Sequence, residues 1–418
     1  MSDAVRASDV GLSSEPYRLA ADTMGTDEIE AAKAVLDSGQ LTMGRRVRTF
    51  EEEFADWVGV DHAIMVNSGS SANLLIVDSL LRPTSNARPF EPGDEVIVPG
   101  LAWPTTVWPL AQLGLVPVFV DVDPATLAVD LDSARSVLGP RTRGMFVIHV
   151  LGRAIDGPRY AAFCAENNLQ LLEDCCESLG AHWAGQHVGK TGTAASFSFY
   201  FSHHVSTIEG GMVVTDDPAL ADDLRGLRAH GWVRDRSDRE SWVSRHPELD
   251  PRFLFATVGY NVRPTEINGA IGSVQLRRLD EMLFARESLA RAVNGWLASS
   301  APWLELIGAN SLEPATAADR RGRSNSWMTL PLRVRSDAPV GRSAVVQHFE
   351  VNRVETRPII AGNLARHPAV AQVRHRTAGS MAVCDGLLRD SFMIGCHPIL
   401  SSGSLATLEN AITSLAGL

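Results

Sequence analysis

Short apolar strands that alternate with amphipathic helices restrict the fold of this chain more than any other feature. Seven such strands follow one another between residues 62 and 215, with helical patterns between several of them. Near-continuous apolar strands separated by helices predict a mostly parallel sheet covered on both faces, whose ligands bind where the strands end. The expected strands are His62–Val66, Glu95–Pro99, Pro117–Val122, Gly144–Val150, Leu169–Glu173, Ala195–Tyr200 and Met212–Thr215, and the helices between them include Ser71–Leu81, Thr105–Leu113 and Pro158–Asn167.

The 418 residues suffice for two α/β domains. We expect a flexible N-terminal segment over residues 1–21, and a large domain with an N-terminal helical arm over 22–264. In this arm Ile29, Ala32 and Val35 share one face of a helix that ends near Gly39. Residues 265–418 should form a long linking helix and a smaller domain. Its expected elements are helix Thr265–Val293, strand Ser326–Val334, helices Gly341–Glu350 and Ala378–Leu388, strand Phe392–Cys396 and helix Ser402–Leu415, with an exposed loop over Asp319–Ser324.

The charge and cysteine content exclude several classes of partner. A formal charge of -11 would repel nucleic acid and anionic membranes. The stretch Val96–Val122 is apolar but broken by prolines, so we expect no membrane span. Met1–Ser14 is polar and predicts no export signal. The five cysteines have no disulfide spacing, which indicates reduced thiols and a cytoplasmic protein, and the pair Cys175-Cys176 is expected to be small buried side chains.

Two segments with small or aromatic residues fall at expected strand ends. Asn67–Asn73 follows a strand and precedes a helix, so its backbone N–H groups and hydroxyls could hold an anion. A capped helix without a ligand is the alternative. Trp103, within Pro99–Thr106, occupies a similar turn, where an indole could stack on a planar ligand or simply belong to the core.

Carboxylates end another expected strand, in Leu171–Glu177. A carboxylate at the end of a buried strand needs a positive partner. The partner could be a protonated pyridine nitrogen, which would keep the ring of a cofactor acting as an electron sink, or it could be an arginine.

The segment Ser196–Gly211 makes the order of these motifs recognisable. The order resembles the DegT/StrS family of sugar aminotransferases, which are fold type I pyridoxal-phosphate (PLP) enzymes. The resemblance extends from about Asp22 to the C-terminus and includes Gly259–Arg263 and Thr356–Pro358, followed by Gly362–Leu364. It implies the fold of that family, with a large PLP-binding domain and a smaller C-terminal α/β domain.

The resemblance also implies roles for individual residues. Phosphate contacts fall on Ser68, Gly69, Ser70 and Ser198; the ring-stacking aromatic is Trp103; and the partner of the pyridinium nitrogen is Asp174. Glu177 stands near the ring hydroxyl, where most aminotransferases of the family carry glutamine. Asn261 matches an asparagine that reaches the phosphate of the neighbouring subunit, which implies a homodimer.

The lysine that binds the cofactor covalently is missing. The family's aminotransferases carry it five residues after the serine matched by Ser198, and that position here is His203. The chain has only two lysines, Lys33 and Lys190, and the motif places neither in the pocket. An imidazole cannot hold the aldehyde covalently, but with an unperturbed pKa of about 6.5 it can act as a general base. The adjacent His204 would point the other way in an extended segment, and we expect it to be structural.

A histidine at this position resembles the small dehydratase branch of the family, which includes GDP-4-keto-6-deoxy-D-mannose 3-dehydratase and an iron–sulfur CDP-sugar 3-dehydrase. The branch implies that pyridoxamine phosphate (PMP) condenses with the C4 ketone of a sugar, typically nucleotide-linked. His203 then moves the proton, and the C3 hydroxyl leaves. L-Glutamate is the expected amino donor. His230, the loop Val233–Phe255 and Arg357 are candidates for substrate contact.

The iron–sulfur chemistry of that branch is not expected. Cys176 could match one ligand, but the loop Val233–Phe255 contains no cysteine, so four thiolates cannot be assembled and no metal site is predicted. Two other functions stay open. One is a lysine-free enzyme that retains the nitrogen and makes an amino or unsaturated amino sugar, on a nucleoside for example. The other is a non-catalytic sensor of cofactor or sugar. Ammonia release would indicate the dehydratase.

Overall fold

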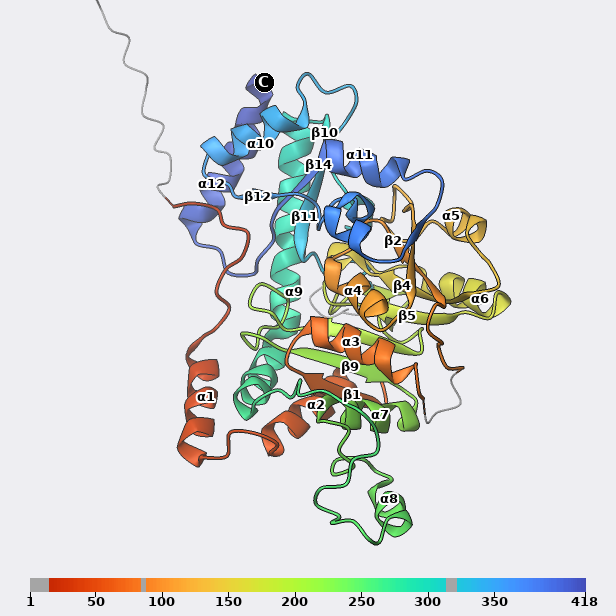
Figure 1. The fold of residues 1–418 in the computed structure, drawn as a ribbon. Coiled ribbons are helices and arrows are strands. Elements are labelled where there is room, and N and C mark those ends of the chain that lie inside the picture. The colour runs from red at the N-terminus through yellow and green to blue at the C-terminus, as the bar shows by residue number, and fades with distance from the viewer. Residues whose placement is uncertain (1–14, 84–87, 313–321) are drawn as a thin grey trace, which may run out of the picture.

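The computed structural model describes residues 15–83, 88–312 and 322–418, which form a large and a small α/β domain connected by one long helix (Figure 1). All seven expected strands of the large domain are present, with ends within two residues of the expected ones. They are β1 (His62–Val66), β2 (Glu95–Pro99), β3 (Val116–Val120), β4 (Thr142–Ile148), β5 (Gln170–Asp174), β8 (Ala194–Ser198) and β9 (Gly211–Thr215).

The large sheet has the order β1-β9-β8-β5-β4-β2-β3-β13. The pairs from β8 through β5, β4 and β2 to β3 are parallel, whereas β9 runs antiparallel to both of its neighbours. Registers Ile148↔Asp174 and Asp174↔Ser196 bring the carboxyl ends of β4, β5 and β8 together at one edge. Ligand sites of open α/β sheets form at this edge.

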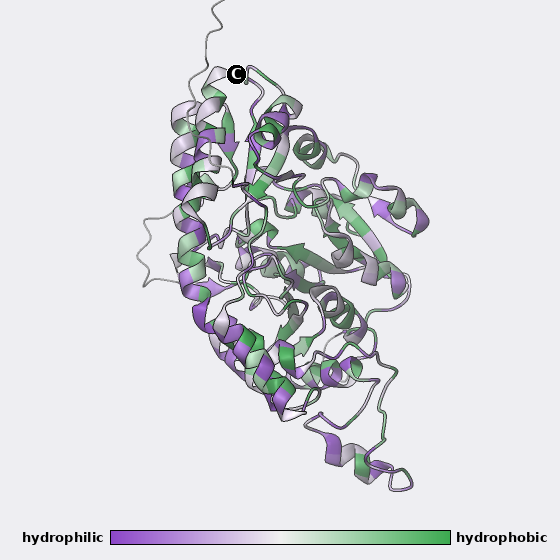
Figure 2. Cartoon of the chain, turned by 90° about the vertical axis from the view of Figure 1, so that its left-hand side faces the viewer, coloured by the Kyte–Doolittle hydropathy of each residue, from purple (hydrophilic) through white to green (hydrophobic). Residues whose placement is uncertain are grey.

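Helices cover both faces of the large sheet, because alternate side chains of its strands point to opposite faces and pack in different cores. In β1, Ile64 and Val66 pack in a core with α3 (Gly69–Ser79), α4 (Pro104–Gln112) and α7 (Pro218–Arg228). The intervening Ala63 and Met65 pack in a second core with α2 (Arg45–Val58) and the long helix α9 (Glu266–Ser300). A third core lies under α5 (Leu131–Ser136) and α6 (Gly157–Glu166). Figure 2 shows the apolar colour concentrated in these central strands.

The N-terminal arm departs from the expected pattern. In α1 (Thr26–Ser38) Val35 is buried, but Ile29 is 50% exposed. The buried face carries Glu28 instead, whose carboxylate accepts hydrogen bonds from Gln275 and Arg278 of α9 at 2.8 and 2.6 Å. The expectation of an apolar face containing Ile29 is therefore wrong, because a buried polar contact with α9 orients the helix.

The described part of the N-terminal segment is fixed to the small domain rather than flexible. Tyr17 is fully buried, and its hydroxyl donates to the carbonyl of Gly395 at 2.8 Å. Its backbone N–H donates to the Arg353 carbonyl at 2.9 Å. The expected flexibility is thus wrong around Tyr17, and residues 1–14 lie outside the described residues.

The small domain is built on an antiparallel sheet of order β10-β11-β14-β12. Its strands are β10 (Leu304–Leu306), β11 (Thr329–Val334), β12 (Thr356–Arg357) and β14 (Ser391–Gly395), and its helices are α10 (Arg342–Val351), α11 (Ala382–Asp390) and α12 (Ser402–Thr413). The short strand β13 (Arg376–Thr377) pairs with β3 of the large sheet. Residues 265–418 therefore contribute a strand to the large domain, which the predicted boundary at 264/265 did not anticipate. Residues 319–321 of the loop expected over Asp319–Ser324 lie outside the described residues; of the other three, Arg323 is buried, so the expected exposure is wrong there.

Helix α9 contains 35 residues, but charged side chains recur along it. Within the described ranges, no helix has both the length and the apolar character that crossing a membrane requires.

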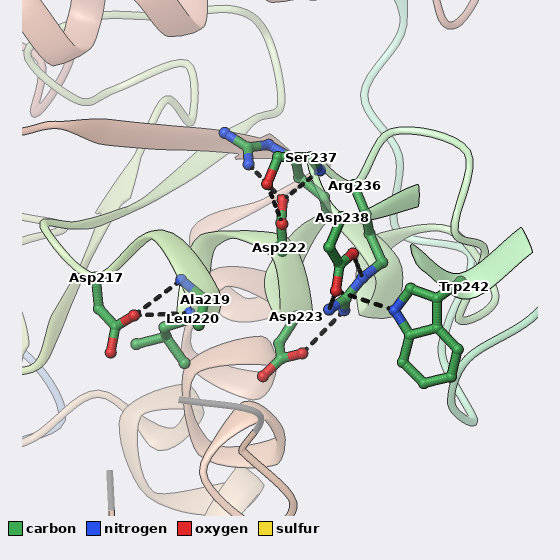
Figure 3. A network of polar contacts seen from close by, with 10 residues as sticks. Asp217, Ala219, Leu220, Asp222, Asp223, Arg236, Ser237, Asp238 and Trp242 are labelled. Atoms are coloured by element: carbon green, nitrogen blue, oxygen red, sulfur yellow. Dashed lines mark hydrogen bonds and ion pairs between the residues drawn. The ribbon is translucent and has the colours of Figure 1, made fainter. Parts of the chain in front are cut away.

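An arm around α8 (Arg239–Arg245) protrudes from the base of the large domain (Figure 1). Figure 3 shows how it is attached to α7. Arg236, almost fully buried, donates to Asp223 at 2.9 Å and to Asp238 at 2.7 Å, and Ser237 donates to Asp222 at 2.5 Å. The arm is thus anchored by the buried guanidinium of Arg236, and Figure 1 shows it at the opposite end of the large domain from the small domain.

Candidate active site

A cavity of about 400 Å³ opens where the carboxyl ends of β4, β5 and β8 face the small domain. It brings together eight of the residues singled out from the sequence. These are Ser68, Gly69, Ser70, Trp103, Asp174, Glu177, Ser198 and His203.

One end of the cavity is the N-terminus of α3. Ser68 caps this helix by accepting a hydrogen bond from the Ser71 N–H at 3.1 Å, and the Ser70 hydroxyl donates to Thr105 at 2.9 Å. A Cβ on Gly69 would lie 2.6 Å from the Ser198 Cβ, so only glycine permits this close approach. Free N–H groups and hydroxyls gathered at a helix N-terminus are suited to a phosphate.

Asp174 is buried at the end of β5 and points into the cavity. One carboxylate oxygen accepts hydrogen bonds from Thr106 at 2.7 Å and Asn73 at 2.9 Å, and the other accepts from the Cys176 N–H at 3.0 Å. These contacts are with neutral donors, and none is with an arginine. The carboxylate is therefore fixed in orientation. Because none of these donors is charged, its negative charge remains available for a positive group of a ligand.

Trp103 is not a core residue. Its side chain is 56% exposed although it precedes α4 and lines the cavity. A large aromatic surface in this position is suited to stacking on a planar ring.

His203 lies in a turn after β8, where its N–H donates to the Tyr200 carbonyl at 2.9 Å. Its ring lies edge-on to that of Tyr200, with centroids 6.0 Å apart. The Nδ1 atom is buried without a hydrogen-bond partner among the described residues. Burial, which disfavours the imidazolium, lowers the pKa to about 4. An ordinary pKa near 6.5 was expected, so His203 is a more strictly neutral base than the sequence suggested.

His204 is buried behind His203, and the segment is a turn rather than an extended strand. Its Nε2 lies 3.0 Å from the carbonyl oxygen of Ser326. Burial and the nearby charge of Arg286 hold its pKa well below the usual value. His204 therefore connects the His203 turn to the chain that enters the small domain.

Two further titratable groups lie beside Asp174. The Glu177 carboxylate accepts a hydrogen bond from the Leu151 N–H at 2.9 Å, and burial raises its pKa to about 7. Cys176 lines the cavity, and burial together with the Asp174 charge raises the pKa of its thiol well above the usual value. Cys175 is buried as expected, but Cys176 is not merely a core residue.

The two lysines are remote from the cavity. Lys190 donates to the Gly59 carbonyl, and Lys33 is exposed on α1. The described lining residues include neither.

Three singled-out residues do not line this cavity. Asn261 is exposed and accepts a hydrogen bond from Arg263 at 3.0 Å. The neighbouring exposed His230 has a positive φ of 64°, and its N–H donates to the Tyr260 carbonyl at 2.6 Å. Arg357 lies in β12, and the 233–255 loop forms the arm around α8.

Several lining residues were not singled out from the sequence. Asn73 and Thr106 belong to motifs singled out from the sequence, but no role was assigned to them there. Their amide and hydroxyl groups could have been predicted to donate hydrogen bonds to the carboxylate at the end of the neighbouring strand. The small-domain residues carried no local signal, because only the folding of distant segments brings them to the cavity. Besides Cys176, which the sequence offered only as a buried residue or a ligand of an iron–sulfur cluster, the additional lining residues are Asn73, Thr105, Thr106, Ile148, Tyr200, Ser202, Glu209, Met328, Ile360 and Met393.

A cluster of possible metal ligands lies behind the cavity, formed by His149, Glu173 and Cys175. The His149 Nε2 lies 2.9 Å from Glu173, whose oxygens also accept N–H bonds from Thr191 and Gly192 at 2.8 and 2.6 Å. Burial alone would raise the pKa of Glu173, but these hydrogen bonds hold it below its usual value. The oxygens of the Glu173 carboxylate are both engaged by donors of the protein, which favours a structural hydrogen bond to His149 over a metal site.

The chain is similar over nearly its whole length to one sequence family. Residues 22–413 match the DegT/DnrJ/EryC1/StrS aminotransferase family. The GDP-4-keto-6-deoxy-D-mannose 3-dehydratase of Yersinia pseudotuberculosis is 34% identical over 400 residues, which cover 95% of this chain and 98% of the relative.

Solved structures show the same similarity. The E. coli GDP-4-keto-6-deoxy-D-mannose-3-dehydratase with bound hydrated PLP has a TM-score of 0.84 and 32% identity, covering 95% of this chain and 99% of its own. A GDP-4-keto-6-deoxymannose-3-dehydratase with a trapped PLP-glutamate geminal diamine has a TM-score of 0.83 and 30% identity, covering 95% and 100%.

Proposed function

The chain belongs to the DegT/DnrJ/EryC1/StrS aminotransferase family, and from this premise we propose that it is a PMP/PLP-dependent 3-dehydratase of a nucleotide-linked 4-keto sugar. The observation that carries the proposal is His203: its imidazole, whose pKa is lowered by burial, lines the cavity beside the proposed phosphate site, and the described lining residues include no lysine. The similarity to GDP-4-keto-6-deoxy-D-mannose 3-dehydratases supports the same reaction.

The cavity fits the cofactor. The helix N-terminus at Ser68–Ser70 would hold the phosphate, and the lack of a side chain at Gly69 allows this helix end to lie close to Ser198. The exposed face of Trp103 would stack on the ring, and Asp174 would pair with the protonated ring nitrogen. When bound, the cofactor supplies an amine that condenses with the C4 ketone and the two electrons that replace C3–OH by C3–H as the amine becomes the aldehyde.

His203 would hold and move the proton. Its unpartnered Nδ1 is available to accept a proton in the buried part of the cavity, and its low pKa keeps it unprotonated at neutral pH. After accepting a proton, the same imidazolium would donate it to the C3 hydroxyl as that group leaves with the C–O electron pair. Thr106 and Asn73 would meanwhile keep the Asp174 charge directed at the ring.

The overall reaction then balances without an external reductant. One 4-keto sugar and one cofactor amine give one 3-deoxy-4-keto sugar, one cofactor aldehyde and one ammonia. An amino donor must restore the amine form, and glutamate is proposed because a similar dehydratase binds it together with PLP.

The test is a comparison of wild type with His203→Asn. The PMP-loaded wild type should release one ammonia per 3-deoxy sugar formed from GDP-4-keto-6-deoxymannose. His203→Asn should slow this turnover by about 100- to 10,000-fold, the usual contribution of a general base, without losing PLP binding. Retention of the nitrogen in the sugar product would favour the amino-sugar enzyme, and unchanged turnover by His203→Asn would refute the proposal.

A further inference from the structure

The face of the small sheet that looks toward the cavity carries an arginine. Residues Arg357 of β12 and Met393 of β14 are directly paired. Paired residues of neighbouring strands project from the same face, with Cβ atoms about 5 Å apart. Met393 lines the cavity, as does Ile360 three residues after Arg357. Arg357 itself does not line the cavity, but it projects from the same face of the sheet as Met393, which does.

The opposite face of the same strands confirms this orientation. Ile394, the neighbour of Met393, is fully buried in the core of the small domain and pairs with Thr356. Alternation along each strand thus separates the core side chains from Met393 and Arg357.

The guanidinium of Arg357 forms no ion pair with a carboxylate in the part of the chain that the structure describes. The side chain is exposed, and its Nη1 donates to the Thr356 carbonyl at 2.7 Å. Other arginines of this domain are held in ion pairs, for example Arg333 with Glu305 at 2.9 Å. Arg357 therefore keeps guanidinium N–H groups available for an anion.

A positive charge near the cavity would be needed if the substrate carries phosphates of its own in addition to the phosphate of the cofactor. Its described lining includes the acidic residues Asp174, Glu177 and Glu209, and neither lysine nor arginine. These carboxylates would repel the diphosphate of a nucleotide-linked sugar unless a positively charged side chain lay beside that diphosphate.

We infer that Arg357 binds a phosphate of the nucleotide carrier while the sugar lies deeper, beside Met393. The inference rests on the proposed function, because it assumes that the sugar reaches the cavity on a nucleotide. It assigns Arg357 to substrate affinity rather than to chemistry. A planar guanidinium can donate two N–H groups to one phosphate, which an ammonium cannot do in the same geometry.

Binding of GDP and dTDP to the PLP-loaded protein tests this directly by calorimetric titration. Arg357→Gln should weaken the better-binding nucleotide by about 10- to 100-fold, the usual value of a charge-assisted hydrogen bond. Arg357→Lys should recover part of the loss. Arg333→Gln, which removes a charge from the same face of the sheet but from an ion pair, should bind like wild type. In turnover, Arg357→Gln should raise KM by the same factor and leave kcat within about threefold.

The inference is overturned if neither nucleotide binds to the wild type, if Arg357→Gln binds as tightly as wild type, or if Arg333→Gln loses as much affinity. A loss of kcat without a change in KM would also overturn it. Failure of the proposed function is a separate result: the wild type would then release no ammonia from the ketosugar, whatever the titrations show for Arg357.

Discussion

Lowering the pH from 7.5 to 5.5 should leave the proton transfer by His203 almost unchanged. The pKa of this imidazole is about 4, because burial disfavours its charged form. With that pKa about 97% of the imidazole is neutral at pH 5.5, whereas an ordinary histidine with a pKa of about 6.5 would be only about 9% neutral. The rate should therefore fall by a few per cent rather than about tenfold.

The assay is a single turnover of PMP-loaded protein with GDP-4-keto-6-deoxymannose, with ammonia measured over time at constant ionic strength. Glu177 titrates in the same range, since burial raises its pKa to about 7. Glu177→Gln removes that ionisation while keeping a side chain of the same shape, so a loss of rate caused by Glu177 disappears in this variant. A tenfold loss with a midpoint near pH 6.5 that persists in Glu177→Gln would refute the assignment of a buried, neutral base.

Three other substitutions test the cofactor site and the fold. Gly69→Ala puts a Cβ 2.6 Å from that of Ser198 and should weaken PLP binding about tenfold or more in a spectrophotometric titration, whereas Gly379→Ala, with no atom within 4 Å of the new Cβ, should not. Asp174→Asn keeps a side chain of the same shape but removes the charge, and kcat should fall about 100-fold with PLP still bound; an unchanged kcat would show that this charge has no role. Tyr17→Phe removes the buried hydrogen bond to the Gly395 carbonyl and should lower the free energy of unfolding by about 1–2 kcal/mol in urea titrations; equal stability would contradict the buried contact.

Local sequence was sufficient to predict the strands of the large domain and to bring most of the candidate cofactor residues to one cavity. Strands such as β4 and β5 are almost fully buried, so their apolar runs are visible without knowledge of the fold. The site residues Ser68–Ser70, Asp174 and Ser198 stand at the ends of these strands, and parallel strands bring such ends to one edge. The comparison with solved dehydratases confirms the expected fold.

The features that the sequence did not predict depend on contacts between distant segments. Ile29 was expected to be buried, but Glu28 takes that place because Arg278 and Gln275, some 250 positions later, offer it partners. The two-residue strand β13 is too short to give a periodic signal and exists only because β3 is an available edge. The low pKa of His203 likewise depends on its burial, which residue type alone does not determine.

The two halves of the cavity are specified by different means, and this separation has a consequence for the chemistry. The cofactor half consists of contiguous motifs on the large sheet, whose geometry is fixed by backbone contacts such as the Gly69–Ser198 approach. The opposite wall consists of single side chains, Met328, Ile360 and Met393, from three separate segments of the small domain. In the proposed reaction, a substitution in this wall would change one contact with the substrate and leave the motifs of the cofactor half in place. Substrate preference would then change residue by residue, whereas the choice between lysine and histidine at position 203 would alter the reaction itself, because it decides whether the protein can hold the aldehyde covalently.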